Sequence, residues 1–220
     1  MLKEFFFKNN KRVLFTLWLA VSFLLWLSST PFVAIGVFVS GLTTLVVYLL
    51  QKPLRVYFDK IKIGTGAKFI LLGSLGALWV ETEFWIIHAL TGAQIVANTN
   101  LLADYAVTMP WYVAMVALFW LVVSRRSYGA FGVFVLGGVY SFFAEAVRAL
   151  AFGEISLELF FVILLFAAPH ALSYSAMLLA PYLLLRDELP KVEKGGILFA
   201  LIPVLGLLVY VPVFLLASLG

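Results

Sequence analysis

Apolar runs long enough to cross a lipid bilayer recur along almost the whole chain, and they constrain its fold more than any other feature. Hydrophobic residues make up 64% of the 220 residues and charged residues make up 12%, whereas a soluble domain typically carries about 25% charged residues. A membrane-spanning helix needs about 20 apolar residues. The sequence therefore predicts an all-α, polytopic membrane protein. It excludes a water-soluble globular protein, a disordered chain and a nucleic-acid-binding domain.

The apolar runs predict seven transmembrane helices that form a single domain over residues 1–220. The predicted helices cover about residues 13–28, 32–50, 69–90, 106–123, 129–150, 157–185 and 196–217. As a continuous helix, the run at 157–185 would be about 43 Å long, which exceeds the bilayer core of about 30 Å. A single tilted helix kinked at Pro169 and a helix broken near Pro169 and His170 are both compatible with this run.

The basic residues fit only one orientation under the positive-inside rule. With the N-terminus inside, all Lys and Arg residues except Arg148 fall in inner segments, and the outer segments carry none. A six- or eight-helix arrangement would place one of the basic clusters on the outer side. We therefore predict a multi-pass protein of the cell membrane, with its N-terminus inside and its C-terminus outside.

Ionisable residues within the predicted spans indicate where function lies, because charge is costly at membrane depth. In the helix 69–90, Glu81, Trp85 and His88 share one face. Glu83 lies about 200° around the helix from Glu81, so we expect the two carboxylates to face different neighbours. His88 is close enough to the membrane surface to be an interfacial residue instead.

Two further spans carry polar residues on one face. Ser141, Glu145 and Arg148 share a face of the helix 129–150, and Glu145 and Arg148 have the i, i+3 spacing of an ion pair. His170 and Tyr174 share a face of the run 157–185. Most of these groups fall in the outer half of the membrane, which predicts an outward-facing polar cavity. Its predicted lining residues, besides the catalytic candidates, are Glu83, His88, Trp85, Trp111, Ser141 and Tyr174.

Structural roles compete with this interpretation. Glu145 and Arg148 can form an ion pair that only joins helices, and the tryptophans can be interfacial or packing residues. The glycines of the helix 129–150 predict a close helix-packing face. They are Gly129, Gly132, Gly137 and Gly138.

Two carboxylates and a histidine are sufficient for general acid–base catalysis. In an enzyme, Glu145 would be the base, His170 would bind the oxyanion or a metal, and Arg148 would orient Glu145. Glu81 would be a second acid or ligand. The same residue types can bind zinc with one position open for water, although their spacing is not diagnostic. The chain has no cysteine, so thiolate metal sites and cysteine nucleophiles are excluded.

The segment 144–170 resembles part of a motif in the CAAX-processing and Abi-type intramembrane proteases. That motif has paired Glu residues followed by Arg, then Phe-x-x-x-His on the next helix. Phe166 and His170 match its second half, and Glu145 and Arg148 match its first half in part. The adjacent second Glu is absent, Arg148 is one residue closer, and no histidine follows His170. The resemblance implies a site in which an Arg-paired Glu faces a helical His.

Three functions remain open from the sequence. The first is an intramembrane hydrolase or transferase that acts on a lipid or a membrane peptide. The second is a small carrier or channel for a solute, coupled to protons through Glu81, with Glu145 and His170 along the path. The third is an assembly subunit whose intramembrane charges meet a partner, and either a homo-oligomer or a larger membrane complex is compatible with it.

Overall fold

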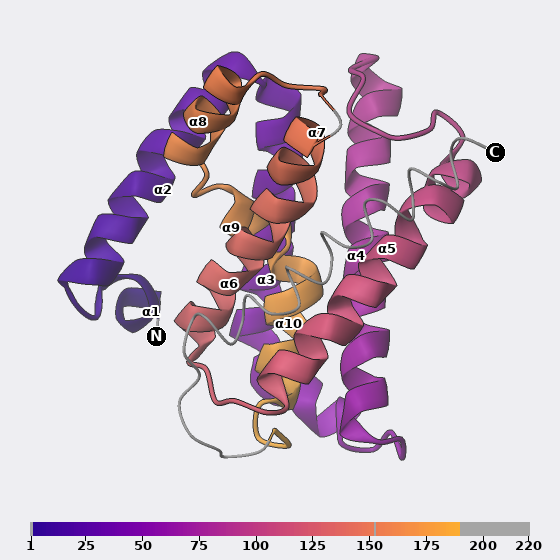
Figure 1. The fold of residues 1–220 in the computed structure, drawn as a ribbon. Helices are drawn as coiled ribbons and strands as arrows, with labels where there is room; N and C mark the ends of the chain where they lie inside the picture. Colours follow the sequence, from indigo (N-terminus) through magenta and orange to yellow (C-terminus); the bar gives the residue numbers. More distant parts are fainter. Residues whose placement is uncertain (1, 152, 190–220) are drawn as a thin grey trace.

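The computed structural model describes residues 2–151 and 153–189, with only the backbone described for Arg148 and Ala151 (Figure 1). The described residues form helices joined by turns, with no β-strand among them, which confirms the predicted all-α class. The elements are α1 (Leu2–Phe7), α2 (Asn10–Ser29), α3 (Pro31–Phe58), α4 (Thr65–Thr91), α5 (Leu101–Val123), α6 (Ala130–Phe142), the π-helical turn η1 (Phe143–Val147), α7 (Arg148–Ala151), α8 (Leu157–Leu165), α9 (His170–Ser173) and α10 (Ser175–Leu185).

Five of these helices are long and apolar enough to cross a membrane, namely α2, α3, α4, α5 and α6 continued by η1. Their outward side chains are apolar as well. Leu14 is 70% exposed, Leu24 64% and Leu90 81%, which is the surface expected of helices that face lipid rather than water. The predicted seventh span, 196–217, lies outside the described residues.

Capping residues explain why two helices begin earlier than predicted. The Asn9 side chain accepts a hydrogen bond from the backbone N–H of Arg12 at 3.1 Å, so α2 begins at Asn10 instead of residue 13. The Asn100 side chain accepts from the N–H groups of Leu102 and Ala103, so α5 begins at Leu101 instead of residue 106. This extension brings Asp104 into the first turn of α5.

The predicted single helix 157–185 is wrong, because the structure divides this run into three pieces. Helix α8 ends at Leu165, residues 166–169 are not helical, and α9 is separated from α10 at Tyr174. Pro169 has no N–H to donate, and it disfavours the helical conformation of the residue before it. The chain therefore breaks near Pro169 and His170, which is the second of the two arrangements compatible with the sequence.

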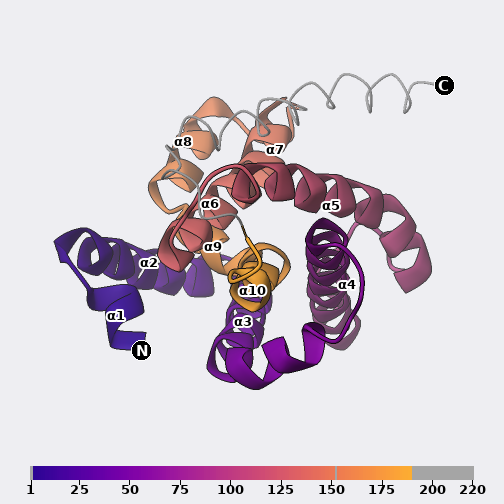
Figure 2. The same cartoon turned by 90° about the horizontal axis from the view of Figure 1, so that it is seen from below.

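Helix α10 lies in the middle of the bundle, in contact with α3, α4 and α6 (Figure 2). All eleven of its residues are buried. Two glycines of α4 allow the close approach: a Cβ atom on Gly76 would lie 2.4 Å from the carbonyl oxygen of Ala176, and one on Gly73 would lie 2.8 Å from that of Met177. Small residues therefore bring the two helix backbones together, as in other membrane bundles.

The predicted glycine face of the helix 129–150 is only partly used for packing. A Cβ atom on Gly138 would lie 2.9 Å from the Ala171 backbone, whereas one on Gly129 would meet nothing within 4 Å. One on Gly132 would approach only the neighbouring Tyr128 side chain. The glycines with the closest interhelical contacts are those of α4, which the sequence analysis did not single out.

Basic segments gather at one end of the bundle. The chain reverses direction between α3 and α4 and again between α5 and α6 at the end where α1 and the end of α10 lie, while residues 92–100 and α7 lie at the other end (Figure 1). Arg55 of α3 and Lys68 of α4 both bond to the segment that ends α10. The basic segments between α3 and α4 and between α5 and α6 therefore lie at the same end, whereas Lys191 and Lys194 lie outside the described residues.

Candidate functional site

Two acidic side chains of neighbouring helices share a buried environment. Glu81 of α4 is 7% exposed and Asp104 of α5 is fully buried. The Glu81 carboxyl interacts with the Asp104 carboxyl and with the Tyr112 hydroxyl. One Asp104 oxygen accepts a hydrogen bond from the backbone N–H of Asn98 at 2.8 Å, and the other is buried and accepts no hydrogen bond from any described residue. Two buried carboxylates repel each other strongly, so this pair is suited to sharing a proton.

A pair of tyrosines continues from Glu81 to Glu145. The rings of Tyr112 and Tyr174 are perpendicular with centroids 5.8 Å apart, and their hydroxyl groups interact. The Tyr174 hydroxyl donates a hydrogen bond of 2.8 Å to Glu145. Glu81 and Glu145 also interact electrostatically. We call this connected set the acid–tyrosine chain: Asp104, Glu81, Tyr112, Tyr174 and Glu145.

The last two members of the acid–tyrosine chain, Tyr174 and Glu145, lie where regular α-helix is interrupted. Glu145 is in the middle of η1, the π-helical turn that follows α6, and Tyr174 separates α9 from α10. Single π-helical turns inside α-helices are frequent at functional sites. Glu145 is exposed, whereas the other four members are buried. The chain therefore leads from the bundle interior to its surface.

His170 is held in a separate contact beside this set. Its Nδ1 atom lies 2.8 Å from the Ser141 hydroxyl, and its Nε2 atom is buried with no hydrogen-bond partner among the described residues. The rings of Trp26 and Phe142 meet the imidazole edge-on, with centroids 5.1 and 5.7 Å away. Neither ring nitrogen of His170 has a hydrogen bond to Glu145 in the described part of the chain. The facing of Glu145 and His170 stays a prediction. The contact between Ser141 and His170 is of the kind that activates a serine nucleophile, in which the imidazole takes the proton of the serine hydroxyl.

Glu83 faces away from Glu81, as the spacing of the two residues predicts. Its carboxylate accepts hydrogen bonds from Ser40 at 2.7 Å and Thr43 at 3.2 Å, both on α3. The Trp79 indole donates to the Thr43 hydroxyl at 2.9 Å. Glu83 is therefore bonded to neutral donors of α3 and does not belong to the acid–tyrosine chain.

Three other residues predicted to line the cavity contact neighbouring parts of the protein, namely Trp85, His88 and Trp111. The Trp85 indole donates to the Thr99 carbonyl at 3.0 Å, and His88 Nδ1 lies 2.6 Å from the Ala93 carbonyl. These bonds hold the connection between α4 and α5. Trp111 is partly buried against the core. The ion pair of Glu145 with Arg148 stays a prediction, because the structure does not describe the Arg148 side chain.

Asp104 and Tyr112 are members of the acid–tyrosine chain that are not among the predicted catalytic residues, although Tyr112 is on the helix 106–123, which is expected to contribute to the cavity lining. Asp104 precedes this predicted helix, which begins at residue 106. The capping potential of Asn100 is the signal that would have extended the helix. Once α5 includes Asp104, the spacing of eight residues places it on the same helical face as Tyr112.

No three acidic or histidine side chains of the described residues are grouped so that they could hold a metal ion. Glu81 interacts with two acidic groups, but neither ring nitrogen of His170 contacts them. The zinc site that the sequence left open therefore has no ligand set in residues 2–151 and 153–189.

Comparison with known proteins adds no assignment, since no family model, curated protein or solved structure matches this chain.

Proposed function

We propose that this protein moves protons within the membrane and couples them to the transport of a small solute. The observation that carries the proposal is the acid–tyrosine chain, in which five protonatable groups from α4, α5, η1 and the break before α10 interact in sequence. Chains of acidic residues buried among membrane helices are typical of proton relays. Glu81 is the proposed protonation site, because it interacts with acidic groups on both sides of it.

The broken run of α8, α9 and α10 supports the same function. Non-helical backbone at membrane depth is tolerated where protein or a water-filled cavity surrounds it. In many transporters, substrate and coupling ions bind where a helix is interrupted near the middle of the membrane. Here Tyr174 lies at such an interruption and bonds to Glu145.

We propose that the protein has seven spans in the cell membrane, with its N-terminus inside and its C-terminus outside. The proposal counts α8, α9 and α10 together as one crossing and residues 196–217 as the last. It is supported by the basic segments gathered at one end of the bundle. Its partners are the lipid bilayer and a small solute, and a homo-oligomer is compatible with the exposed apolar surface.

Proton movement can be measured in liposomes that contain the purified protein and a trapped pH-sensitive dye. A potassium gradient with valinomycin supplies the driving potential. We expect acidification well above that of empty liposomes, and we expect Glu81→Gln to lower the rate at least tenfold, because it removes the group that takes up the proton.

Glu83→Gln is the matched control, because it makes the same change two residues away on a side chain bonded to Ser40 and Thr43. It should conserve the rate. Infrared spectra of the protein should also show a carboxylic acid band that changes with pH and is altered by Glu81→Gln. A wild-type protein that neither acidifies liposomes nor has such a band would overturn the proposal.

An intramembrane hydrolase or transferase is the second candidate, and the contact between Ser141 and His170 favours it. In this function the substrate is a lipid or a membrane peptide, and Glu145 and Glu81 supply the acid–base groups. Mass spectrometry of membrane lipids from expressing cells should then detect a product that disappears with Ser141→Ala and Glu145→Gln. Proton movement that survives Ser141→Ala, with no change in the lipids, would favour transport instead.

A further inference from the structure

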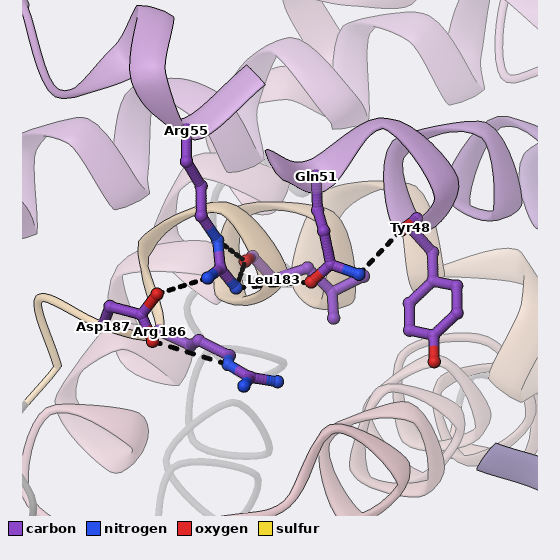
Figure 3. Close-up of polar contacts among 6 residues, drawn as sticks. All are labelled: Tyr48, Gln51, Arg55, Leu183, Arg186 and Asp187. Atoms are coloured by element: carbon purple, nitrogen blue, oxygen red, sulfur yellow. Dashed lines mark hydrogen bonds and ion pairs between the residues drawn. The ribbon is translucent and has the colours of Figure 1, made fainter. Parts of the chain in front are cut away.

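Side chains of α3 bind the end of α10 at the basic end of the bundle. The Arg55 Nε atom donates to the Leu183 carbonyl at 2.9 Å, and a second guanidinium nitrogen donates to the same oxygen (Figure 3). A third guanidinium nitrogen forms an ion pair with the Asp187 carboxylate. Gln51 accepts from Arg55 at 3.3 Å. A single arginine therefore binds both the Leu183 carbonyl in the last turn of α10 and the acidic residue Asp187 beyond the helix.

Side chains of α4 bind the next acidic residue. Lys68 donates to Glu188 at 3.0 Å, and the Thr65 hydroxyl donates to the other oxygen of the same carboxylate at 2.8 Å. Lys68 is 7% exposed, although lysines are almost never buried without a partner. The segment that follows α10 is thus bonded on one side to α3 and on the other to α4.

The opposite end of α10 adjoins the acid–tyrosine chain. Tyr174, the residue before α10, bonds to Glu145 and interacts with Tyr112. Ser175, the first residue of α10, lies 2.7 Å from the Thr44 hydroxyl of α3. A short, fully buried helix therefore connects the proposed proton site to the ion pairs at the basic end. Such a helix moves as a unit, because its backbone bonds are internal.

We propose that α10 is a plug that closes the basic end of the transport path, and that the bonds of Arg55 and Lys68 to Asp187 and Glu188 are the latch that holds it. The inference rests on the proposed transport function and names the device that regulates it. When the basic end opens, α10 separates from α3 and α4. The ion pairs of Arg55 with Asp187 and of Lys68 with Glu188 then break, and water hydrates the four charged groups. The break at Tyr174 supplies the hinge that permits this movement without displacing α8.

Thiol labelling tests the latch directly, because the chain has no cysteine. Leu185→Cys introduces one thiol at a position that is 1% exposed and lies at the latch end of α10, away from the hinge. The rate of its reaction with a small positively charged methanethiosulfonate is measured in lipid nanodiscs, which expose both ends of the bundle. Adding Arg55→Ala should accelerate labelling about tenfold or more, because charge-assisted hydrogen bonds shift an equilibrium by such factors.

Lys62→Ala is the matched control, since it removes an exposed positive charge in the link between α3 and α4. It should leave the labelling rate unchanged. If Arg55→Ala does not fold, Glu188→Gln replaces it, because this change keeps the size of the side chain and removes the charge that pairs with Lys68. Size-exclusion chromatography checks that each variant is folded. Unchanged labelling in a folded latch variant overturns the proposal.

The labelling does not depend on proton movement, so the two proposals fail separately. If the latch variants are labelled faster but the protein moves no protons, the transport proposal is wrong and the proposal that ion pairs hold α10 in place stands. If the protein moves protons but the substitutions at Arg55 and Glu188 do not change the labelling rate, the latch proposal is wrong and the transport proposal stands. A rate that rises equally in the Lys62→Ala control assigns the effect to general charge and also overturns the latch.

Discussion

Tyr174 joins the buried part of the candidate site to its exposed end. It donates to Glu145, interacts with Tyr112 and occupies the break between α9 and α10. Its side chain is 2% exposed. A buried hydroxyl with acidic neighbours can both accept and donate a proton, so Tyr174 links the interior carboxyl pair to the exposed Glu145.

At the residue scale, Tyr174→Phe should lower proton movement about tenfold or more, because it removes the hydroxyl between two members of the relay. It keeps the ring that packs on Tyr112. The loss of one hydrogen bond to a charged group should cost about 1.5–3 kcal/mol of stability. Dye-loaded liposomes measure the rate, and thermal unfolding in detergent measures the stability.

The control is Tyr182→Phe, which makes the same change on α10, where the hydroxyl donates to the Tyr128 carbonyl. It should reduce stability by about 0.5–1.5 kcal/mol, since its acceptor is a neutral carbonyl, and it should conserve proton movement. Equal losses of movement in both variants would mean that the hydroxyl of Tyr174 has no specific role.

At the scale of elements, α10 depends on how closely helix backbones approach. Gly76 allows α4 to touch the Ala176 carbonyl. In a membrane, helices associate through close packing rather than through exclusion of water, so small residues at such contacts matter more than apolar ones. The length of the run 157–185 therefore does not reveal where α10 lies, since glycines of another helix position it.

Gly76→Ala should lower the stability by about 1–3 kcal/mol, because the added Cβ meets a backbone carbonyl that cannot rotate away. Gly132→Ala is the comparison, since a Cβ there approaches only the Tyr128 side chain at 4.0 Å and the position lies inside α6, where Ala is a better helix former than Gly. It should leave stability unchanged or raise it slightly. Thermal unfolding of the two variants measures the difference, and a similar midpoint for both would contradict the close contact of α4 with α10.

At the scale of the whole molecule, charge and apolar length together set the architecture. The segments between α3 and α4 and between α5 and α6 are basic and lie at one end of the bundle. The segment 92–100 at the other end has no basic residue. The difference predicts the orientation across the membrane, because positive residues remain on the cytoplasmic side.

The orientation can be measured with single cysteines in this cysteine-free chain. Ser127→Cys, at the basic end, should react with a membrane-impermeant maleimide only after the cells are permeabilised. Gln94→Cys, at the opposite end, should react in intact cells. Both positions are exposed. The reverse pattern would place the N-terminus outside, and reaction at both positions in intact cells would mean that both orientations occur.

The sequence by itself determined the properties that depend on local patterns. Apolar length predicted the first five long helices, loop charge predicted a shared basic end, and the spacing of Glu81 and Glu83 predicted that they face different neighbours. Tertiary structure alone decided that Tyr174 bonds to Glu145, that His170 bonds to Ser141, and that α10 lies at the centre of the bundle. Those contacts join residues that are far apart in the chain, and their partners depend on where helices cross and break. Helical periodicity specifies the face of a residue but not the helix that it meets.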